Sequence, residues 1–352
     1  MRIISMLMIV MLHVLLHGGI LDAVLPGTVN YGLVWLLETA AYCGVNCYAL
    51  ISGYVSLKSQ YRYSNIIYLW IQVSGINLLC TAFFYIMEPE TVEKWGILRG
   101  IFPVLNDTYW YFTAYFALFF FIPFLNYLVQ NLEQQQMKRL LLGTVILFSI
   151  LPTIANADIF RISSGYSAFW LAILYLAGAY ICKYKNTMKK FKGIYLLIYS
   201  GCVLISWCSK IGIEYVNRQK GLFLDSECFL KYTSPFILIA AVSLLLFFKD
   251  LKVPSGISKV ILRIALLTFG VYLWHDNPLI RENWLSDKLI WVAGLPSIQM
   301  LGTIFMMTLL IFAMGCCIEF ARQICFDRLG VRKICRWFAC KMLKFFGKKW
   351  NG

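Results

Sequence analysis

The chain has 352 residues, of which 60% are hydrophobic and only 14% are charged. Soluble domains carry about a quarter charged residues, so this composition excludes a soluble protein and indicates an integral membrane protein. The formal net charge of +15 follows from where the basic residues lie relative to the membrane, as described below, and it gives no reason to expect a nucleic-acid partner.

Apolar runs recur along the chain and are continuous rather than alternating, which favours helices over a barrel. Each run holds roughly 20 residues, enough for a helix to cross about 30 Å of hydrocarbon. We therefore predict an all-α integral membrane protein with about ten transmembrane helices. The predicted spans are residues 3–21, 31–57, 65–87, 107–130, 139–156, 166–182, 193–211, 232–248, 258–276 and 297–320.

The lysines and arginines give an independent test of this count. If Met1 lies in the cytoplasm, most of the 32 basic residues fall in every second connection and in the C-terminal tail. The positive-inside rule expects this pattern for an even number of spans with both termini cytoplasmic. We accordingly predict one multi-span membrane domain, residues 1–321, followed by a basic cytoplasmic tail, residues 322–352.

The first predicted span places His13 eleven positions after Arg2. At 100° per residue, the two side chains lie about 20° apart around a helix and roughly 16 Å apart along it. His13 is thus expected deep in the membrane, where ionisable groups are costly and tend to mark functional sites, and a neutral imidazole suits a general base. The alternatives are that His13 only satisfies a helix contact, and that Arg2 only flanks the span rather than binding phosphate.

The second predicted span ends in the stretch SGYVSLKSQYR. Its small residues Ser52 and Gly53 either let a neighbouring helix approach closely or leave room for a thin acyl chain, and the sequence does not separate these interpretations. Lys58 and Arg62 follow on the predicted cytoplasmic side and are candidates to bind an anionic donor.

Aromatic residues crowd the fourth predicted span, which contains WYFTAYFALFFFIPFLNYL. At the outer edge of a membrane such residues form an aromatic belt, but rings beside polar groups also suit a carbohydrate. Trp110 and Tyr115 are therefore candidates to bind a sugar acceptor.

The ninth predicted span ends abruptly in His275, Asp276 and Asn277. His275 closes this span on the outer side, whereas His13 is expected deep in the first. We therefore predict that only His13 lies where a cytoplasmic donor and an outer acceptor meet. His275 and Asp276 would bind the acceptor or orient helices at the outer rim.

The basic tail after Arg322 mixes lysine and arginine with tryptophan and phenylalanine. This pattern favours an interfacial helix held by anionic lipid, and the alternative is a docking site for a cytoplasmic partner or an anionic donor.

The 12 cysteines lie mostly within spans or on the inner side, which argues against a disulfide framework. Cys43 and Cys47 lack histidine or acidic neighbours at metal-ligand spacing, so we expect packing residues and no metal site.

Four segments, in this order, resemble the membrane acyltransferase 3 family, which includes O-acetyltransferases of surface polysaccharides. Arg2 and His13 fit the family's R-x10-H signature. ALISGYVSL is similar to its second-span segment, WYFTAYFALFFFIPFLNYL to its W-F-x3-Y segment, and TFGVYLWHDNP to its late G-x-Y-L-x-H segment. The chain departs from the family in two places. Lys58 and Arg62 stand where many members have an Arg-x-x-Arg cluster. Arg2 directly follows Met1, which leaves open a start further upstream or a truncated protein.

The resemblance implies transfer of an acyl group, usually acetyl from cytoplasmic acetyl-CoA, to a hydroxyl of a cell-surface or lipid-linked polysaccharide. It implies that His13 is the essential histidine with Arg2 as its partner, and that Ser52 and Gly53 belong to the passage for the acyl group or CoA. It further implies a bacterial-type cytoplasmic membrane and no permanently bound cofactor. The implied partners are acyl-CoA, a glycan acceptor and the lipid bilayer.

Two functions of other classes stay open at this point. A transporter or flippase of lipid-linked glycans should show broken helices in repeated halves and buried coupling acids. Here only Glu38 is clearly an acid within a predicted span, and no internal repeat is apparent. A glycan polymerase is also many-spanned but should have a large outer loop, whereas the predicted outer loops are short.

Overall fold

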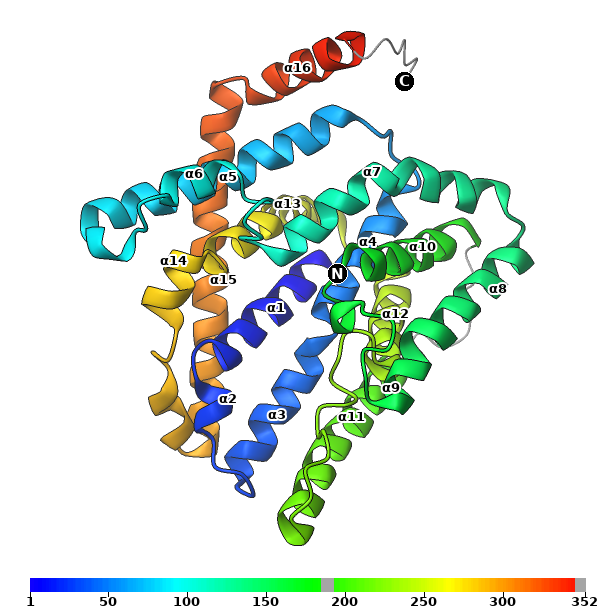
Figure 1. Ribbon diagram of the computed structural model, residues 1–352, viewed down its shortest axis with the longest axis vertical. Coiled ribbons are helices and arrows are strands. Elements are labelled where there is room, and N and C mark those ends of the chain that lie inside the picture. The colour runs from blue at the N-terminus through cyan, green and yellow to red at the C-terminus, as the bar shows by residue number, and fades with distance from the viewer. Residues whose placement is uncertain (185–192, 346–352) are drawn as a thin grey trace.

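The computed structural model of the protein describes residues 1–184 and 193–345, and within these ranges every regular element is a helix (Figure 1). The predicted all-α fold class is confirmed. The predicted inner connection at residues 185–192 and the end of the predicted tail at residues 346–352 lie outside the described residues. The α-helices are α1 (Arg2–Leu16), α2 (Ile20–Ala23), α3 (Val29–Tyr42), α4 (Gly44–Ser56), α5 (Tyr63–Met87), α6 (Gly96–Ile101), α7 (Trp110–Asn131), α8 (Gln134–Val145), α9 (Leu151–Ala155), α10 (Ala168–Tyr184), α11 (Gly193–Lys220), α12 (Pro235–Lys249), α13 (Ser255–His275), α14 (Pro278–Ile280), α15 (Ser297–Arg328) and α16 (Val331–Phe345).

Seven helical segments of the described chain are long and apolar enough to cross a membrane. They are Val29–Ser56, Tyr63–Met87, Trp110–Asn131, Gln134–Ala155, Gly193–Lys220, Ser255–His275 and Ser297–Arg328. Three further apolar helices, α1, α10 and α12, fall short in length, since 15 to 17 residues reach only about 22–26 Å. Each of the predicted spans overlaps one of these helices, and the ten-span topology with both termini inside stays a prediction.

Helix α1 lies at the centre of the bundle. It packs against α3 and α4 and also against α13 and α15, and Figure 1 shows it running between α3 and α13. Val10, Val14 and Leu15 on this helix are fully buried. Contact of these apolar side chains with the neighbouring helices stabilises the position of α1. The polar residues that α1 carries therefore come to lie inside the protein.

Helix α1 ends at a pair of glycines. Gly19 has a φ of +78°, a left-handed conformation that glycine adopts readily and other residues rarely do. The carbonyl groups of His17 and Gly18 accept hydrogen bonds of 2.9 and 3.0 Å from the backbone N–H groups of Asp287 and Leu289. A segment that follows α13 and α14 thus caps α1, and the helix stops well before residue 21, where we predicted the end of the first span.

Two glycines let α4 and α10 pack almost backbone to backbone. A Cβ atom added to Gly53 would lie 2.0 Å from the carbonyl oxygen of Tyr175, and one added to Gly178 would lie 2.0 Å from the carbonyl oxygen of Leu50. Small residues at such positions are the usual means by which helices approach closely within a membrane. The contact fixes α4, which forms one wall of the site described below.

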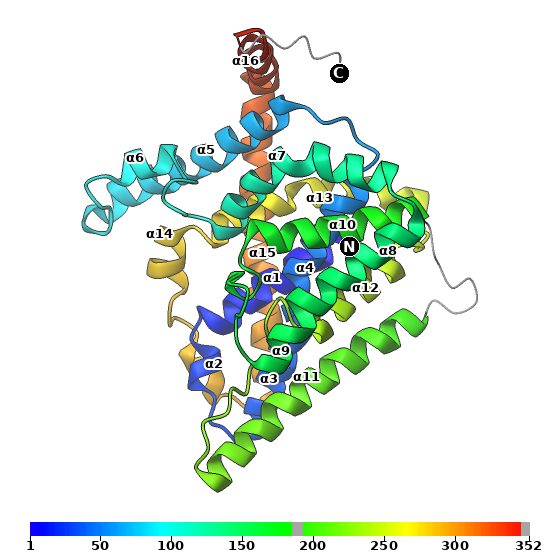
Figure 2. The ribbon, with the colours of Figure 1, turned by 45° about the vertical axis from the view of Figure 1, so that its right-hand side comes forward.

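The C-terminal part of the described chain turns back over α5. Gly330, with a φ of +65°, follows α15 and starts the turn into α16, which packs along α5 (Figures 1 and 2). The buried residues of α16 are Val331, Cys335 and Ala339, one helical turn apart, and basic residues stand beside this stripe. The predicted tail therefore contains an amphipathic helix whose apolar stripe contacts the protein itself.

Candidate active site

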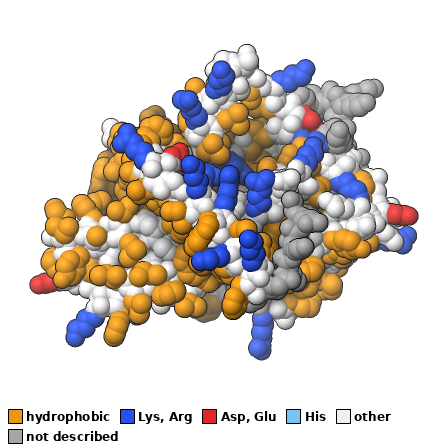
Figure 3. Space-filling model, turned by 90° about the horizontal axis from the view of Figure 1, so that it is seen from above, with side chains coloured by type: hydrophobic (Ala, Val, Ile, Leu, Met, Phe, Trp, Pro, Cys, Tyr) orange, Lys and Arg blue, Asp and Glu red, His pale blue; other side chains and the backbone are white. Residues whose placement is uncertain are grey.

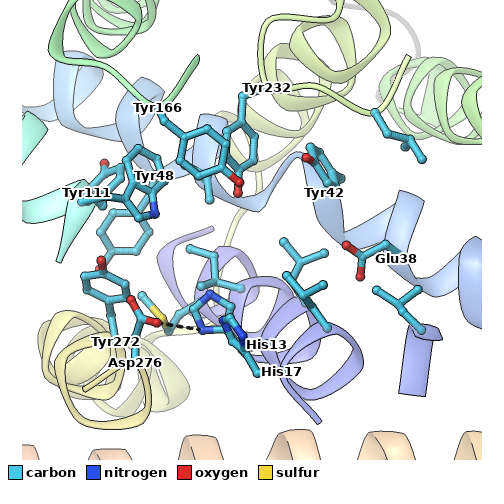
Figure 4. A pocket seen from close by; sticks show the side chains of 18 of the residues that line it. His13, His17, Glu38, Tyr42, Tyr48, Tyr111, Tyr166, Tyr232, Tyr272 and Asp276 are labelled. Atoms are coloured by element: carbon cyan, nitrogen blue, oxygen red, sulfur yellow. Dashed lines mark ion pairs between the residues drawn. The ribbon is translucent and has the colours of Figure 1, made fainter. Parts of the chain in front are cut away.

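A cavity of about 360 Å³ opens in the middle of the bundle beside α1. We call it the central cavity. Tyrosine is the commonest residue in its wall. Its histidine and acidic side chains come from α1 and the residue after it, from α2 and α3, from the end of α13 and from the loop between α11 and α12. Figure 4 labels His13, His17, Glu38, Tyr42, Tyr48, Tyr111, Tyr166, Tyr232, Tyr272 and Asp276, and Trp110, Glu227 and Arg281 also line the cavity.

The chain's three histidines meet beside this cavity. Nδ1 of His13 lies 2.9 Å from Nε2 of His275, and the rings of His13 and His17, one turn apart on α1, have centroids 4.9 Å apart. The predicted separation, with His13 deep and His275 at the outer rim, is therefore wrong. The physical reason is the early end of α1, because a helix that stops at Leu16 carries His13 in its last turn, level with the end of α13.

The hydrogen bonds determine where two neutral imidazoles carry their protons. Nδ1 of His275 lies 2.6 Å from the carbonyl oxygen of Val271, and because a carbonyl only accepts, this nitrogen carries the hydrogen. Nε2 of His275 must then accept from Nδ1–H of His13. The lone pair of the His13 ring is left on its own Nε2, and this arrangement prepares His13 to act as a base at that atom.

Asp276 supplies negative charge next to the histidines. Its Oδ1 lies 3.8 Å from Nδ1 of His13, marked by the dashed line in Figure 4, and 3.3 Å from Nη1 of Arg281. Because Asp276 is only 4% exposed, the electrostatic interaction is weakly screened, and a proton gained by His13 is stabilised by the nearby carboxylate. Arg281 orients that carboxylate through a charged hydrogen bond.

A second cavity, of about 490 Å³, lies where the start of α1 meets α5, α13, α15 and α16. We call it the arginine cavity because five arginines line it: Arg2, Arg62, Arg322, Arg332 and Arg336. Among the described residues at this cavity Glu319 is the one acid, and its Oε1 pairs with Nη2 of Arg322 at 2.6 Å. Phe269 of α13 lines both the arginine cavity and the central cavity, so the two adjoin at this aromatic ring.

A third cavity, of about 610 Å³, adjoins the central cavity at other residues. We call it the polar cavity, since amide, hydroxyl and charged side chains such as Asn77, Asn106 and Glu93 dominate its wall. It shares Trp110 and Asp276 with the central cavity, together with Arg281. The central cavity thus meets the arginine cavity at Phe269 and the polar cavity at Asp276. These two residues are about 10 Å apart along α13.

Half of the predicted site residues line these cavities. The two catalytic candidates are divided, because His13 lines the central cavity while Arg2, at the other end of α1, lines the arginine cavity together with Arg62. The acceptor candidates Trp110 and Asp276 line both the central and the polar cavities. Arg2 is therefore grouped with the donor candidates rather than beside His13.

The other predicted site residues line none of the three cavities; they are Ser52, Gly53, Lys58, Tyr115 and His275. Helix α10 fills the space beside Gly53, so the passage interpretation is wrong for this residue and helix packing explains it. The Ser52 hydroxyl donates to the carbonyl of Tyr48 at 3.1 Å, and Lys58 is exposed. His275 is 2% exposed with both ring nitrogens bonded inside the protein, so its geometry suits orienting His13 rather than touching an acceptor.

Several residues at the cavities were missed from the sequence. Arg281 follows Asp276 by little more than one helical turn, and this spacing could have predicted the ion pair between them. Arg332 and Arg336 belong to the basic tail, for which docking of an anionic donor was kept as an alternative, but neither residue was singled out. Glu38 is 6% exposed, lines the central cavity and has one carboxylate oxygen without a hydrogen-bond partner among the described residues; its place within an apolar span was the one clue.

One part of the site has the donor set for a metal ion. His13, His17 and Asp276 each offer a ligand atom, and these atoms lie within 4.8 Å of one another. Imidazole and carboxylate are ligands that zinc accepts. An ion there would compete with proton transfer at His13, and our expectation of no metal site stays a prediction.

Comparison with known proteins gives the family. No curated protein and no solved structure matches the chain. The model of the Acyl_transf_3 family, described as an acyltransferase domain, matches residues 1–321, which is most of the chain and includes His13, Asp276 and all of the central cavity. The protein therefore belongs to the acyltransferase 3 family and is a multi-pass membrane acyltransferase.

Proposed function

We propose that the protein transfers an acetyl group from cytoplasmic acetyl-CoA to a hydroxyl of a cell-surface or lipid-linked polysaccharide, with His13 as the general base. The observation that carries this proposal is the succession of three adjoining cavities, with His13 in the middle one. Guanidinium groups suit the phosphates of CoA. Hydroxyl, amide and aromatic groups in the polar cavity suit a sugar.

The donor would enter from the arginine cavity. Its phosphates bind near Arg2 and Arg62, and its thioester arm passes Phe269 to reach the level of His13. The acceptor would enter from the polar cavity and lie against Trp110, whose ring stacks on Tyr232 at 5.9 Å with an interplanar angle of 22°. Each substrate thus approaches the base from its own side, which lets the two meet without crossing.

In the proposed reaction the acetyl group passes directly from the donor to the acceptor. Nε2 of His13 takes the proton of the acceptor hydroxyl while that oxygen attacks the thioester carbonyl carbon, and the carbon–sulfur bond then breaks. The proton passes from His13 to the departing thiolate, so the products are the acetyl ester and free CoA. His275 accepts from Nδ1–H of His13 throughout, and Asp276 stabilises the imidazolium. Tyr111 and Tyr272 line the same cavity, and their buried hydroxyl groups have no hydrogen-bond partner among the described residues, so they are candidates to stabilise the oxyanion.

General-base catalysis contributes typically about 10²–10⁴-fold, so substitution of His13 tests the proposal directly. Cells that produce the wild-type protein, the His13→Ala variant or no protein are compared by mass spectrometry of their surface polysaccharide. The wild type should add the mass of acetyl groups, and His13→Ala should not, although immunoblots show equal amounts of both proteins in the membrane.

The same experiment distinguishes the rival functions. Acetylation that persists in His13→Ala would contradict the role of His13. Loss of the polysaccharide from the cell surface, or a change in its chain length, without any change in substituents would favour a lipid-linked glycan transporter or a polymerase instead.

A further inference from the structure

Helix α16 lies beyond the residues that the family model matches, yet it lines the arginine cavity. The match ends at residue 321, whereas Arg332 and Arg336 of α16 are part of the cavity wall. They stand one turn apart, each next to the buried stripe by which α16 packs on α5. Residues spaced by four on a helix share one face, so α16 presents both guanidinium groups to the cavity together.

The wall between α5, α15 and α16 is held by stacked and paired side chains. The guanidinium carbon of Arg332 lies 4.5 Å from the ring centroid of Tyr68 on α5. The hydroxyl of the same tyrosine accepts a hydrogen bond from Arg322 at 3.3 Å. Arg322 is itself fixed by two hydrogen bonds to Glu319, of 2.6 and 2.7 Å. Tyr68 therefore links α16 to a buried ion pair, which gives the tail a defined position at the cavity.

The charges of this cavity do not balance. Glu319 neutralises Arg322, and at the described wall no further acid faces the remaining arginines Arg2, Arg62, Arg332 and Arg336. Figure 3 shows Lys and Arg side chains gathered around a hollow on this face, with few Asp or Glu side chains near them. Concentrated guanidinium groups in a concave site favour a ligand with several negative charges.

We propose that α16 forms part of the donor site and that Arg332 and Arg336, together with Arg2 and Arg62, bind the phosphate groups of the acyl donor's nucleotide portion. This inference rests on the proposed function and extends it to the tail. A phospholipid headgroup carries the same phosphate chemistry, but the cavity adjoins the central cavity at Phe269. An acyl donor needs such a connection because its thioester has to reach His13, whereas the binding of a lipid headgroup does not require one.

The test uses the full-length protein in nanodiscs of uncharged phosphatidylcholine, with CoA as the probe in titration calorimetry. The variant Arg332→Gln/Arg336→Gln is compared with Lys333→Gln/Lys341→Gln, which removes two charges from the same helix at positions outside the cavity. The dissociation constant of CoA should rise at least about tenfold in the arginine variant and stay unchanged in the lysine variant. Arg332→Lys/Arg336→Lys should recover part of the affinity because it keeps the charge.

Activity and lipid binding separate the remaining outcomes. In acetyl transfer the arginine variant should raise the KM for acetyl-CoA and leave kcat unchanged, since these residues lie away from the reacting atoms. Equal weakening of CoA binding in the arginine and lysine variants would overturn the proposal. Unchanged CoA binding in the arginine variant, together with reduced binding to vesicles containing phosphatidylglycerol, would also overturn it and would assign the arginines to lipid. If the wild-type protein neither binds CoA nor transfers acetyl, the proposed function itself fails. Assignment of the arginines to lipid would contradict only the role of α16 and not the proposed function.

Discussion

Nδ1 of His13 lies 2.9 Å from Nε2 of His275, although the two residues are 262 positions apart in the chain. The contact joins the last turn of α1 to the last turn of α13, and the bond from His275 to the Val271 carbonyl fixes its direction. In the proposed mechanism His13 acts on the substrate, and His275 determines which nitrogen of the His13 ring is basic.

The first prediction concerns His275 as a positioning residue. His275→Leu removes the acceptor for Nδ1–H of His13 and should lower kcat about 10- to 100-fold, less than loss of a general base itself, with KM for acetyl-CoA unchanged. His275→Gln offers a carbonyl oxygen in its place and should recover much of the loss. Steady-state kinetics of the two variants in nanodiscs test this, and equal activity of Gln and Leu at this position would show that the hydrogen bond plays no part.

The second prediction concerns Phe269, which lines both the arginine and the central cavities. Phe269→Trp should narrow the connection between them, so kcat for acetyl transfer should fall at least about tenfold as the thioester reaches His13 less well. CoA should keep most of its affinity in calorimetry, because the phosphate contacts lie elsewhere and only the thioester arm passes Phe269. Wild-type kcat in this variant would mean that the donor reaches His13 by another path.

The third prediction concerns the contact between α4 and α10. Gly53→Ala places a Cβ atom 2.0 Å from the Tyr175 carbonyl oxygen, so the helices must separate, and we expect a loss of about 1–3 kcal/mol in the free energy of unfolding. Gly201→Ala on α11 is the matched control, since nothing lies within 4 Å of its added Cβ and alanine favours the helix. Unfolding of both variants in detergent measures the difference, and a Gly53→Ala protein as stable as the control would refute the packing role.

The fourth prediction concerns metal ions at the histidines. Chelators should leave acetyl transfer unchanged, whereas added Zn²⁺ should inhibit by binding among His13, His17 and Asp276, whose ligand atoms lie within 4.8 Å of one another. In His17→Ala the Zn²⁺ concentration for half-inhibition, relative to that variant's own uninhibited rate, should rise at least about tenfold. Inactivation by chelators and recovery with Zn²⁺ would show instead that the metal is a working part of the site.

The sequence predicts the parts of this protein that local pattern controls. Continuous apolar runs require helices in a membrane, and a histidine inside the first run indicates a candidate site because an ionisable group is costly there. The position of His275 could not be obtained in this way, since it depends on where α1 stops, and Gly18 and Gly19 end that helix in concert with a distant segment. Gly53 shows the same limit, because only the placement of α10 decides whether a small residue leaves an opening or fills a contact.

For the tail, the sequence offered a docking site for an anionic donor only as an alternative and singled out no residue. The positive-inside rule already accounts for basic residues at a cytoplasmic end, so nothing distinguished Arg332 and Arg336 from the other basic residues of the tail. Their place in the wall of the arginine cavity depends on the tertiary fold, because α16 turns back over α5, beside Tyr68 and Arg322.

The cap on α1 has a consequence for the order of assembly. The helix that carries His13 leaves the ribosome long before Asp287 and Leu289, whose backbone N–H groups bind the carbonyls at its end. The same late part of the chain contributes His275, Asp276 and Arg281 to the site. A contact between such distant parts forms only after both have been synthesised, so in a nascent chain the helix that carries His13 lacks a finished site until the segment up to Leu289 has been made.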